Sequence, residues 1–197
     1  MILIGTVGQL LDGGMISFAY QYPSDNPYYE MRGVIGSTSH YATVIGIAYL
    51  VPLILTVPVG GIVADRFNRS NILVGSMLLM HLSTFAIGFS TKYLEILVTR
   101  IILGFSQGLF IPASLSLIVD YFPPARQTMA FAILGVSSSF GGAIINETTL
   151  FISIWGWRDT FRIIAGILLG FTVIAFFILN EPARGKFTFI KKGQNAT

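Results

Sequence analysis

The sequence has no cysteine and few charged residues. Of its 197 residues, 11% are charged, whereas soluble domains carry about 25%. The absence of cysteine excludes disulfides and thiolate metal sites. The low charge and the 53% hydrophobic content exclude an ordinary soluble domain and indicate a membrane protein. The net charge of +3 comes from basic residues spread between apolar segments, so no nucleic-acid partner is expected.

Patterns typical of enzymes are also missing from the sequence. No residues follow the order of a catalytic triad, and none form a nucleotide loop, a metal-ligand cluster or a catalytic carboxylate pair. We therefore expect no enzymatic activity, no cofactor and no metal. The first residues, MILIGTVG, lack the basic region of a signal peptide and are predicted to begin a membrane span abruptly, as if a segment preceded them.

Long apolar segments make up most of the chain. A helix needs about 20 apolar residues to cross a bilayer, and six segments approach that length. They predict an all-α membrane bundle over residues 1–179, followed by a polar cytoplasmic tail at 180–197. Pro52 and Pro58 are expected to kink the second span. The predicted spans are residues 2–22, 39–64, 72–90, 94–119, 129–154 and 163–179.

Lysine and arginine residues are distributed unequally between the two sides of such a bundle. The side with more of them is expected to be cytoplasmic, which puts both termini in the cytoplasm. That side carries seven basic residues: Arg66, Arg69, Arg126, Arg184, Lys186, Lys191 and Lys192. The other side carries four: Arg32, Lys92, Arg158 and Arg162.

Two similar stretches indicate an internal repeat. ADRFNRSNIL joins the second and third spans, and WRDTFRIIAG joins the fifth and sixth. Both place Asp, Phe and Arg just before an apolar run. The similarity predicts two three-helix units that are inverted relative to each other across the membrane.

Two charged residues are predicted to lie within spans. Asp12 lies midway along the first span and Arg100 lies six residues into the fourth, and a charge at that depth is costly unless it faces the bundle interior. Gln107 is expected to share a helix face with Arg100. The two charges could form a pair that only holds helices together, or a site where a proton, ion or anionic substrate competes. Glu147, near the far end of the fifth span, is a further candidate for this site or a headgroup contact.

Small residues predict close contacts between helices. Gly104 and Gly108 form a small-xxx-small step in the fourth span, and the fifth span is rich in glycine between Gly135 and Gly142. His81, the single histidine of the third span, is expected to be a hydrogen-bonded packing residue.

A polar turn, DRFNRSN, separates the second and third spans. Arg66 and Arg69 are expected to fix this turn at the cytoplasmic side and to pair with Asp120, in the joint between spans four and five. Asp65 is placed to meet the positive end of a neighbouring helix. Gly61, just before the turn, allows helices to approach closely.

Together these residues resemble the N-terminal six-helix half of a major facilitator superfamily transporter. The stretch from Gly61 to Arg69 is similar to that superfamily's motif between helices two and three, and Asn68 within it is the form found in the Spinster-like branch. Glu181-Pro-Ala-Arg-Gly after the last span also resembles that branch. By resemblance, a cytoplasmic gate motif comprises Gly61, Asp65, Arg66, Asn68, Arg69, Asp120 and Arg126.

The resemblance implies a secondary transporter that works by alternating access. Spinster-like proteins move lysolipids and sphingoid phosphates, and an acid of helix one and an arginine of helix four line their cavity, which corresponds to Asp12 and Arg100. It also implies proton coupling, although Gln107 stands where many members have a titratable glutamate and Gly13 stands where many have arginine.

The expected partners are membrane lipids, a lipid-like or organic-anion substrate, and a second six-helix half that is covalently attached or supplied by dimerisation. The chain is expected to be a fragment of a longer product or a dimerising half-transporter. The alternative is a non-transporting membrane scaffold derived from a transporter.

Overall fold

A computed structural model describes residues 2–23, 26 and 29–182 of the chain. Every regular element within these residues is a helix. Six of the helical segments are long and apolar enough to cross a membrane. The predicted all-α bundle of six spans is confirmed.

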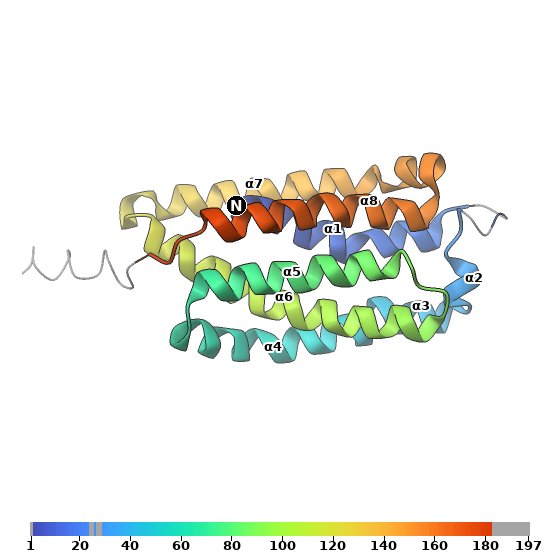
Figure 1. Cartoon of the computed structure of the whole chain (residues 1–197), viewed down its shortest axis with the longest axis horizontal. Helices are drawn as coiled ribbons and strands as arrows, with labels where there is room; N and C mark the ends of the chain where they lie inside the picture. The colour runs from blue at the N-terminus through green and yellow to red at the C-terminus, as the bar shows by residue number, and fades with distance from the viewer. Residues whose placement is uncertain (1, 24–25, 27–28, 183–197) are drawn as a thin grey trace, which may run out of the picture.

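The described residues form eight helices, because one predicted span is divided and one loop carries a short helix (Figure 1). Their bounds are α1 Ile2–Gln21, α2 Arg32–Ile35, α3 Thr38–Ile45, α4 Ile47–Arg66, α5 Arg69–Ile87, α6 Tyr93–Tyr121, α7 Pro124–Asn146 and α8 Thr148–Ile178.

The second span is interrupted at Gly46. The break between α3 and α4 lies at this residue, whose φ of −94° and ψ of −93° are not helical. Pro52 and Pro58, where kinks were expected, both lie inside α4. The amide of Leu50 still donates to the carbonyl of Gly46 at 2.7 Å, so the two helices continue as one segment of 29 residues.

The segment predicted as the fifth span, residues 129–154, covers parts of two helices. α7 begins at Pro124 and ends at Asn146, and α8 begins at Thr148. α8 is itself broken at Gly156, whose φ of 72° is a conformation that favours glycine. The sixth span therefore begins well before Ile163, and the buried Trp157 and Phe161 belong to it.

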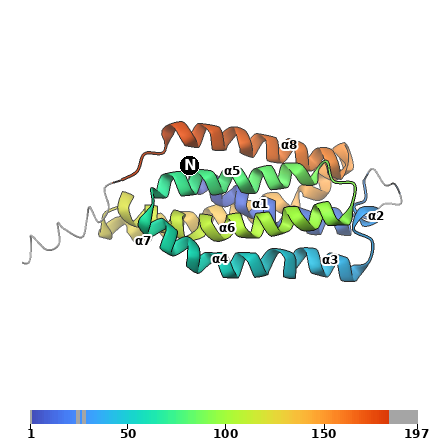
Figure 2. The same ribbon diagram turned by 60° about the horizontal axis from the view of Figure 1, so that its bottom comes forward.

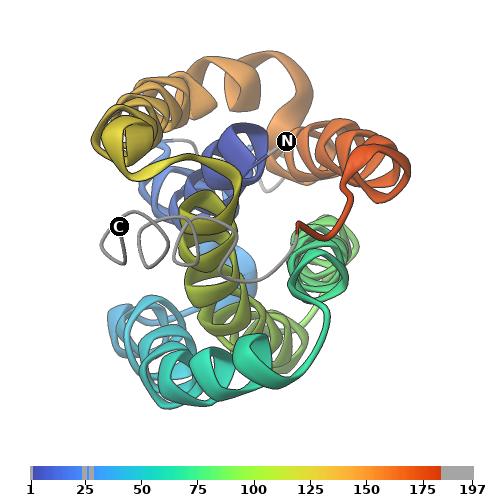
Figure 3. The ribbon, with the colours of Figure 1, turned by 90° about the vertical axis from the view of Figure 1, so that its left-hand side faces the viewer.

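The two halves of the bundle repeat each other in inverted orientation. α1 packs on α7 and α8, and α6 packs correspondingly on α4 and α5, while α5 packs on α8. Exchanging the first three spans with the last three converts one set of contacts into the other. α1 and α6 run in opposite directions and lie at the centre of the end-on view (Figures 2 and 3). The predicted inverted repeat is thus confirmed.

The turns gather at two ends of the bundle. The turn between α4 and α5, the turn between α6 and α7, and the end of α8 lie together at the end that we call the turn end (Figure 1). The joint between α5 and α6 and the break between α7 and α8 lie at the opposite end, the loop end.

A layer of polar residues separates two apolar clusters along the bundle. One cluster includes Ile87 of α5 and Ile96 of α6, and the other includes Met77 and Met80 of α5 and Leu103 of α6. Between these positions α5 and α6 carry His81 and Arg100, which are 1% exposed.

Candidate functional site

Asp12 of α1 and His81 of α5 form a fully buried pair. Nδ1 of His81 lies 2.6 Å from Oδ2 of Asp12, and the side chains are 1% and 0% exposed. The second carboxylate oxygen of Asp12, Oδ1, is buried without a hydrogen-bond partner. A buried carboxylate oxygen without a hydrogen bond is costly.

Gly8, one helical turn before Asp12, makes room for the imidazole. A Cβ at this position would lie 2.6 Å from Cε1 and 3.2 Å from Nε2 of His81. Side chains at positions i and i+4 share a helix face. α1 therefore offers the histidine a carboxylate at Asp12 and an open space at Gly8.

Arg100 of α6 reaches the backbone of α1 rather than the carboxylate. Its Nη1 donates to the carbonyls of Asp12 at 3.1 Å and Gly13 at 3.2 Å. Its Nε and Nη2 are buried without a partner. A guanidinium normally uses such a pair of donors for a carboxylate or phosphate. One edge of Arg100 is thus anchored, and the other makes no hydrogen bond within the described residues.

Gln107 links three of the helices around this cluster. Its Nε2 donates to the carbonyl of Gln9 in α1 at 2.8 Å, and its Oε1 accepts from the hydroxyl of Tyr49 in α4 at 2.5 Å. Both ends of the amide are therefore occupied, which fixes its orientation. Gln107 therefore joins α6 to α1 and α4.

The structure brings together three of the four expected site residues. Asp12, Arg100 and Gln107 lie in one buried cluster, whereas Glu147 is exposed at the break between α7 and α8, outside it. The sequence predicted a hydrogen-bonded His81, which the structure shows, but not that its partner is Asp12 or that Tyr49 binds Gln107. The one available signal for His81 was a lone histidine in a span without charge, which also fits a packing residue.

Glycines hold α4 and α6 close enough for these contacts. A Cβ at Gly108 would lie 2.6 Å from Cβ of Thr56, and one at Gly60 would lie 2.6 Å from the carbonyl oxygen of Gly108. A Cβ at Gly104 would collide with the carbonyl of Tyr49. The predicted close approach at Gly104 and Gly108 is confirmed, and it brings Tyr49 to Gln107.

A second polar cluster lies at the turn end. Arg69 forms a short ion pair with Asp120 of α6, as expected from the sequence, and its Nη2 lies 3.8 Å from Oδ1 of Asp65. Asn68 accepts a hydrogen bond from the amide of Asn71 at 2.9 Å and so caps α5.

The remaining residues of the expected gate motif lie on the surface of this end. Arg66 and Arg126 are exposed. A Cβ at Gly61 would meet no atom within 4 Å, so its small size is not required by any contact within the described residues.

The segment after α8 closes the turn end of α5. Oε2 of Glu181 accepts from the amide of Ser70 at 2.8 Å, in the first turn of α5, where the helix dipole favours a carboxylate. The carbonyl of Asn180 accepts from the hydroxyl of Tyr121. The rest of the predicted tail, from residue 183 onward, lies outside the described residues.

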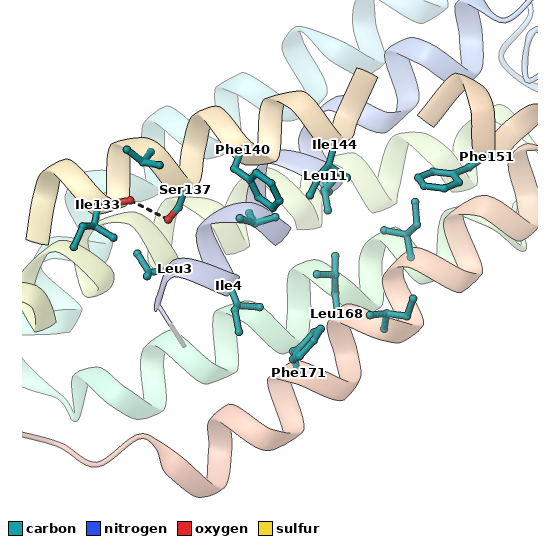
Figure 4. A pocket seen from close by; sticks show the side chains of 14 residues that line it. Leu3, Ile4, Leu11, Ile133, Ser137, Phe140, Ile144, Phe151, Leu168 and Phe171 are labelled. Atoms are coloured by element: carbon teal, nitrogen blue, oxygen red, sulfur yellow. Dashed lines mark hydrogen bonds between the residues drawn. The ribbon is translucent and has the colours of Figure 1, made fainter. Parts of the chain in front are cut away.

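An apolar groove of about 600 Å³ lies between α1, α7 and α8 (Figure 4). Leu3, Ile4 and Leu11 of α1 face Phe140 of α7 and Phe171 of α8 across it. The hydroxyl of Ser137, which also lines the groove, donates to the carbonyl of Ile133 in its own helix at 2.9 Å. The groove therefore offers an alkyl chain apolar contacts. α1 presents one face to this groove and another to the polar cluster.

The comparisons with known proteins agree on one family. The profile described as Major Facilitator Superfamily matches residues 2–196. The chain is 28% identical over 154 residues to the probable sulfoacetate transporter SauU of Cupriavidus necator, covering 77% of this chain and 36% of that protein. It is 26% identical over 149 residues to the probable galactarate/D-glucarate transporter GarP of Escherichia coli K12, covering 72% of this chain and 32% of that protein.

A solved structure shares the fold. The crystal structure of a bacterial homologue of the human lysosomal transporter Spinster, inward-facing and occupied, superposes with a TM-score of 0.83 at 19% identity, covering 94% of this chain and 44% of that chain. The chain thus spans less than half the length of each of these relatives.

Proposed function

The chain belongs to the Major Facilitator Superfamily, and we propose that it forms half of a secondary transporter for an organic anion, with Arg100 as the anion-binding group. The observation that carries this proposal is the buried guanidinium whose Nε and Nη2 have no partner. A group that only stapled helices would use these donors, because each buried donor without a partner costs about 1–3 kcal/mol.

We propose an amphiphilic anion such as a lysolipid or a sphingoid phosphate as the substrate. The anionic group would bind Arg100, and the apolar groove along α1 supports an alkyl chain. The substrates named for the two curated relatives, sulfoacetate and galactarate or D-glucarate, are small anions. These anions share the negative charge of a lysolipid but lack its alkyl chain. Uptake of the two kinds of anion can therefore be compared directly.

Proton coupling belongs to the same proposal. Asp12 is the acid nearest Arg100 in the cluster, and it retains a buried oxygen without a partner. Taking up a proton at Asp12 or at the group bonded to it offsets the negative charge beside Arg100, which leaves the cation available for the anion of the substrate.

A second six-helix half is the proposed partner. α4 and α7 leave most of their apolar side chains exposed, including Leu55 and Val136, each 68% exposed. Gly135 and Gly142 on α7 have no atom within 4 Å of an added Cβ, so another helix could approach closely there. The gate motif would then latch the two halves at the turn end, which we take to be cytoplasmic.

Uptake into proteoliposomes that contain the full-length protein tests the anion site. Lysine keeps the charge of arginine but not its paired donors, so Arg100→Lys should reduce uptake about tenfold or more, because a charged hydrogen bond contributes about 1.5–3 kcal/mol. Arg32→Lys, at an arginine side chain that is 51% exposed, is the matched control.

The probes are a lysophosphatidate, sulfoacetate and D-glucarate, offered separately. Uptake of the lysophosphatidate alone supports the amphiphilic substrate, and uptake of the small anions alone replaces it with a small-anion substrate. No uptake of any probe, with a protein that is folded, would favour the non-transporting scaffold.

A further inference from the structure

We propose that Asp12 and His81 act as one protonatable unit, and that the proton that accompanies the anion is taken up on the imidazole of His81. This inference rests on the proposed function and assigns a role to a histidine that the function so far leaves unused. His81 is a positioning and proton-holding residue of the site and does not itself touch the substrate.

Geometry places a proton between the two side chains. At 2.6 Å, Nδ1 of His81 and Oδ2 of Asp12 must share a hydrogen bond, since two lone pairs would repel each other at this distance. With an ionised Asp12, Nδ1 carries the hydrogen and Nε2 is the ring position that remains for a second proton. The imidazole packs against Gly8, where a Cβ would lie 3.2 Å from Nε2, so only glycine at this position accommodates the ring.

Charge balance within the cluster then links the proton to the anion. The carboxylate of Asp12 balances Arg100 as long as His81 is neutral. A proton on Nε2 gives an imidazolium that pairs with Asp12, which leaves the charge of Arg100 without a counter-charge. Because net charge is costly in a buried site, an anion at Nε and Nη2 of Arg100 restores neutrality. The unit takes up one proton for one negative charge bound at Arg100, so the symport of a monoanion is electroneutral.

Other groups around the pair do not offer a competing proton site. Tyr49 of α4 and Tyr41 of α3 are the titratable side chains that act electrostatically on Arg100 besides Asp12. The hydroxyl of Tyr49 already donates to Gln107, which cannot titrate. On α8, the side chain next to Gly8 is the apolar Leu168, and α7 packs on this part of α1 with Gly141. Asp12, His81 and Arg100 therefore determine the charge of the cluster.

The first experiment separates a structural from a titrating role of His81. Asparagine can present an amide N–H at the place of Nδ1 but cannot take up a proton. In full-length protein in proteoliposomes, His81→Asn should make anion exchange between equal pools independent of pH and should lose uptake driven by a proton gradient. The expected loss is about tenfold or more. Thr84→Val, three residues further on the same helix, removes a buried hydroxyl that bonds only within α5 and is the matched control.

Two results of this experiment would overturn the proposal. If His81→Asn retains proton-driven uptake, the histidine has only a structural role. If exchange by folded His81→Asn still rises as the pH falls, as it does in Thr84→Val, the proton is taken up at another group. The lysophosphatidate and the small anions used above serve as probes.

The second experiment needs no transport and so distinguishes failure of this inference from failure of the proposed function. The sequence contains two histidines, His40 and His81. In protein with ¹⁵N-labelled histidine rings, NMR identifies which ring nitrogen of His81 carries the proton. We expect Nδ1 in the parent and a changed proton position in Asp12→Ala, with His40 unchanged. An unchanged His81 spectrum in Asp12→Ala would show that the two side chains do not share a proton, whatever the protein transports.

Discussion

At the scale of the residue, the site is determined by which polar atoms are satisfied and which are not. Arg100 is 1% exposed, and the backbone carbonyls of Asp12 and Gly13 hold one of its nitrogens. Its other nitrogens have no partner, nor does Oδ1 of Asp12. Polar atoms buried in this state are costly. A function that uses them explains their retention better than packing does.

Gly8→Ala tests the space for the imidazole. The added methyl group would lie 2.6 Å from Cε1 of His81, so the ring must move away from Asp12. Overpacking of this kind costs about 1–3 kcal/mol, and we expect a lower midpoint of thermal unfolding in detergent together with a changed His81 NMR signal. Gly75→Ala in α5, where a Cβ meets no atom within 4 Å, is the control. Equal midpoints for the two variants would contradict the prediction.

The ion pair at the turn end gives a second prediction at this scale. The side chains of Arg69 and Asp120 are 13% and 9% exposed. Asp120→Asn removes a charge from the pair and leaves Arg69 poorly compensated, which should lower the free energy of unfolding by about 1–3 kcal/mol. Asp65 offers the control, since its side chain is 77% exposed. Asp65→Asn should change the free energy of unfolding by less than about 1 kcal/mol. A larger effect of Asp65→Asn than of Asp120→Asn would show that Arg69 is stabilised mainly by Asp65 and would contradict the prediction.

At the scale of the element, glycine determines how closely α4 and α6 approach each other. Gly104 and Gly108 lie on one face of α6, against Tyr49 and Thr56 of α4. This approach puts the hydroxyl of Tyr49 on the amide of Gln107. A wider separation of α4 and α6 would therefore weaken both their packing and the hydrogen bond between Tyr49 and Gln107.

Gly108→Ala should weaken this contact. Its Cβ would lie 2.6 Å from Cβ of Thr56 and 3.0 Å from the carbonyl of Leu53, neither of which can move without its backbone. We expect a loss of about 1–3 kcal/mol, measured as a lower midpoint of thermal unfolding. Gly166→Ala in α8 adds the same methyl group where no atom lies within 4 Å, and its midpoint should not fall. If Gly108→Ala is as stable as Gly166→Ala, the close approach is not needed for stability.

At the scale of the whole molecule, the inverted repeat places the two central helices at equivalent positions. α1 carries Asp12 and α6 carries Arg100 and Gln107, and each central helix packs on two helices of the other half of the bundle. The polar cluster thus forms where the two three-helix units meet. Inverted repeats commonly place a substrate site at such an interface.

The orientation in the membrane can be tested directly because the sequence has no cysteine. Thr91 at the loop end and Thr128 near the turn end are both exposed. If the turn end is cytoplasmic, as the basic residues indicate, a membrane-impermeant maleimide should label Thr91→Cys in intact cells. It should label Thr128→Cys only after the cells are made permeable. The reverse pattern would place the turn end outside.

Residue types and their order were enough to predict a membrane protein and a buried cluster that includes Asp12 and Arg100. Apolar runs long enough to cross a bilayer predicted six spans. Two charges too deep for a headgroup contact predicted an interior cluster with Asp12 and Arg100. The turn chemistry at Asn68 and the pairing of Arg69 with Asp120 also followed from residue type and position.

The hydrogen-bond partners within the cluster depend on how the helices pack and could not be read from the sequence. Sequence spacing gives the face of one helix, but not which side chain of another helix meets it. Asp12 was therefore expected to pair with Arg100, whereas its carboxylate binds His81 and Arg100 binds the backbone of α1. The break between α7 and α8 at Glu147 was missed because apolar residues stand on both sides of it, and the interruption of α8 at Gly156 has no separate signal in the sequence. The sequence leaves several hydrogen-bond partners possible for one side chain, and the contacts between distant segments determine which of them it meets.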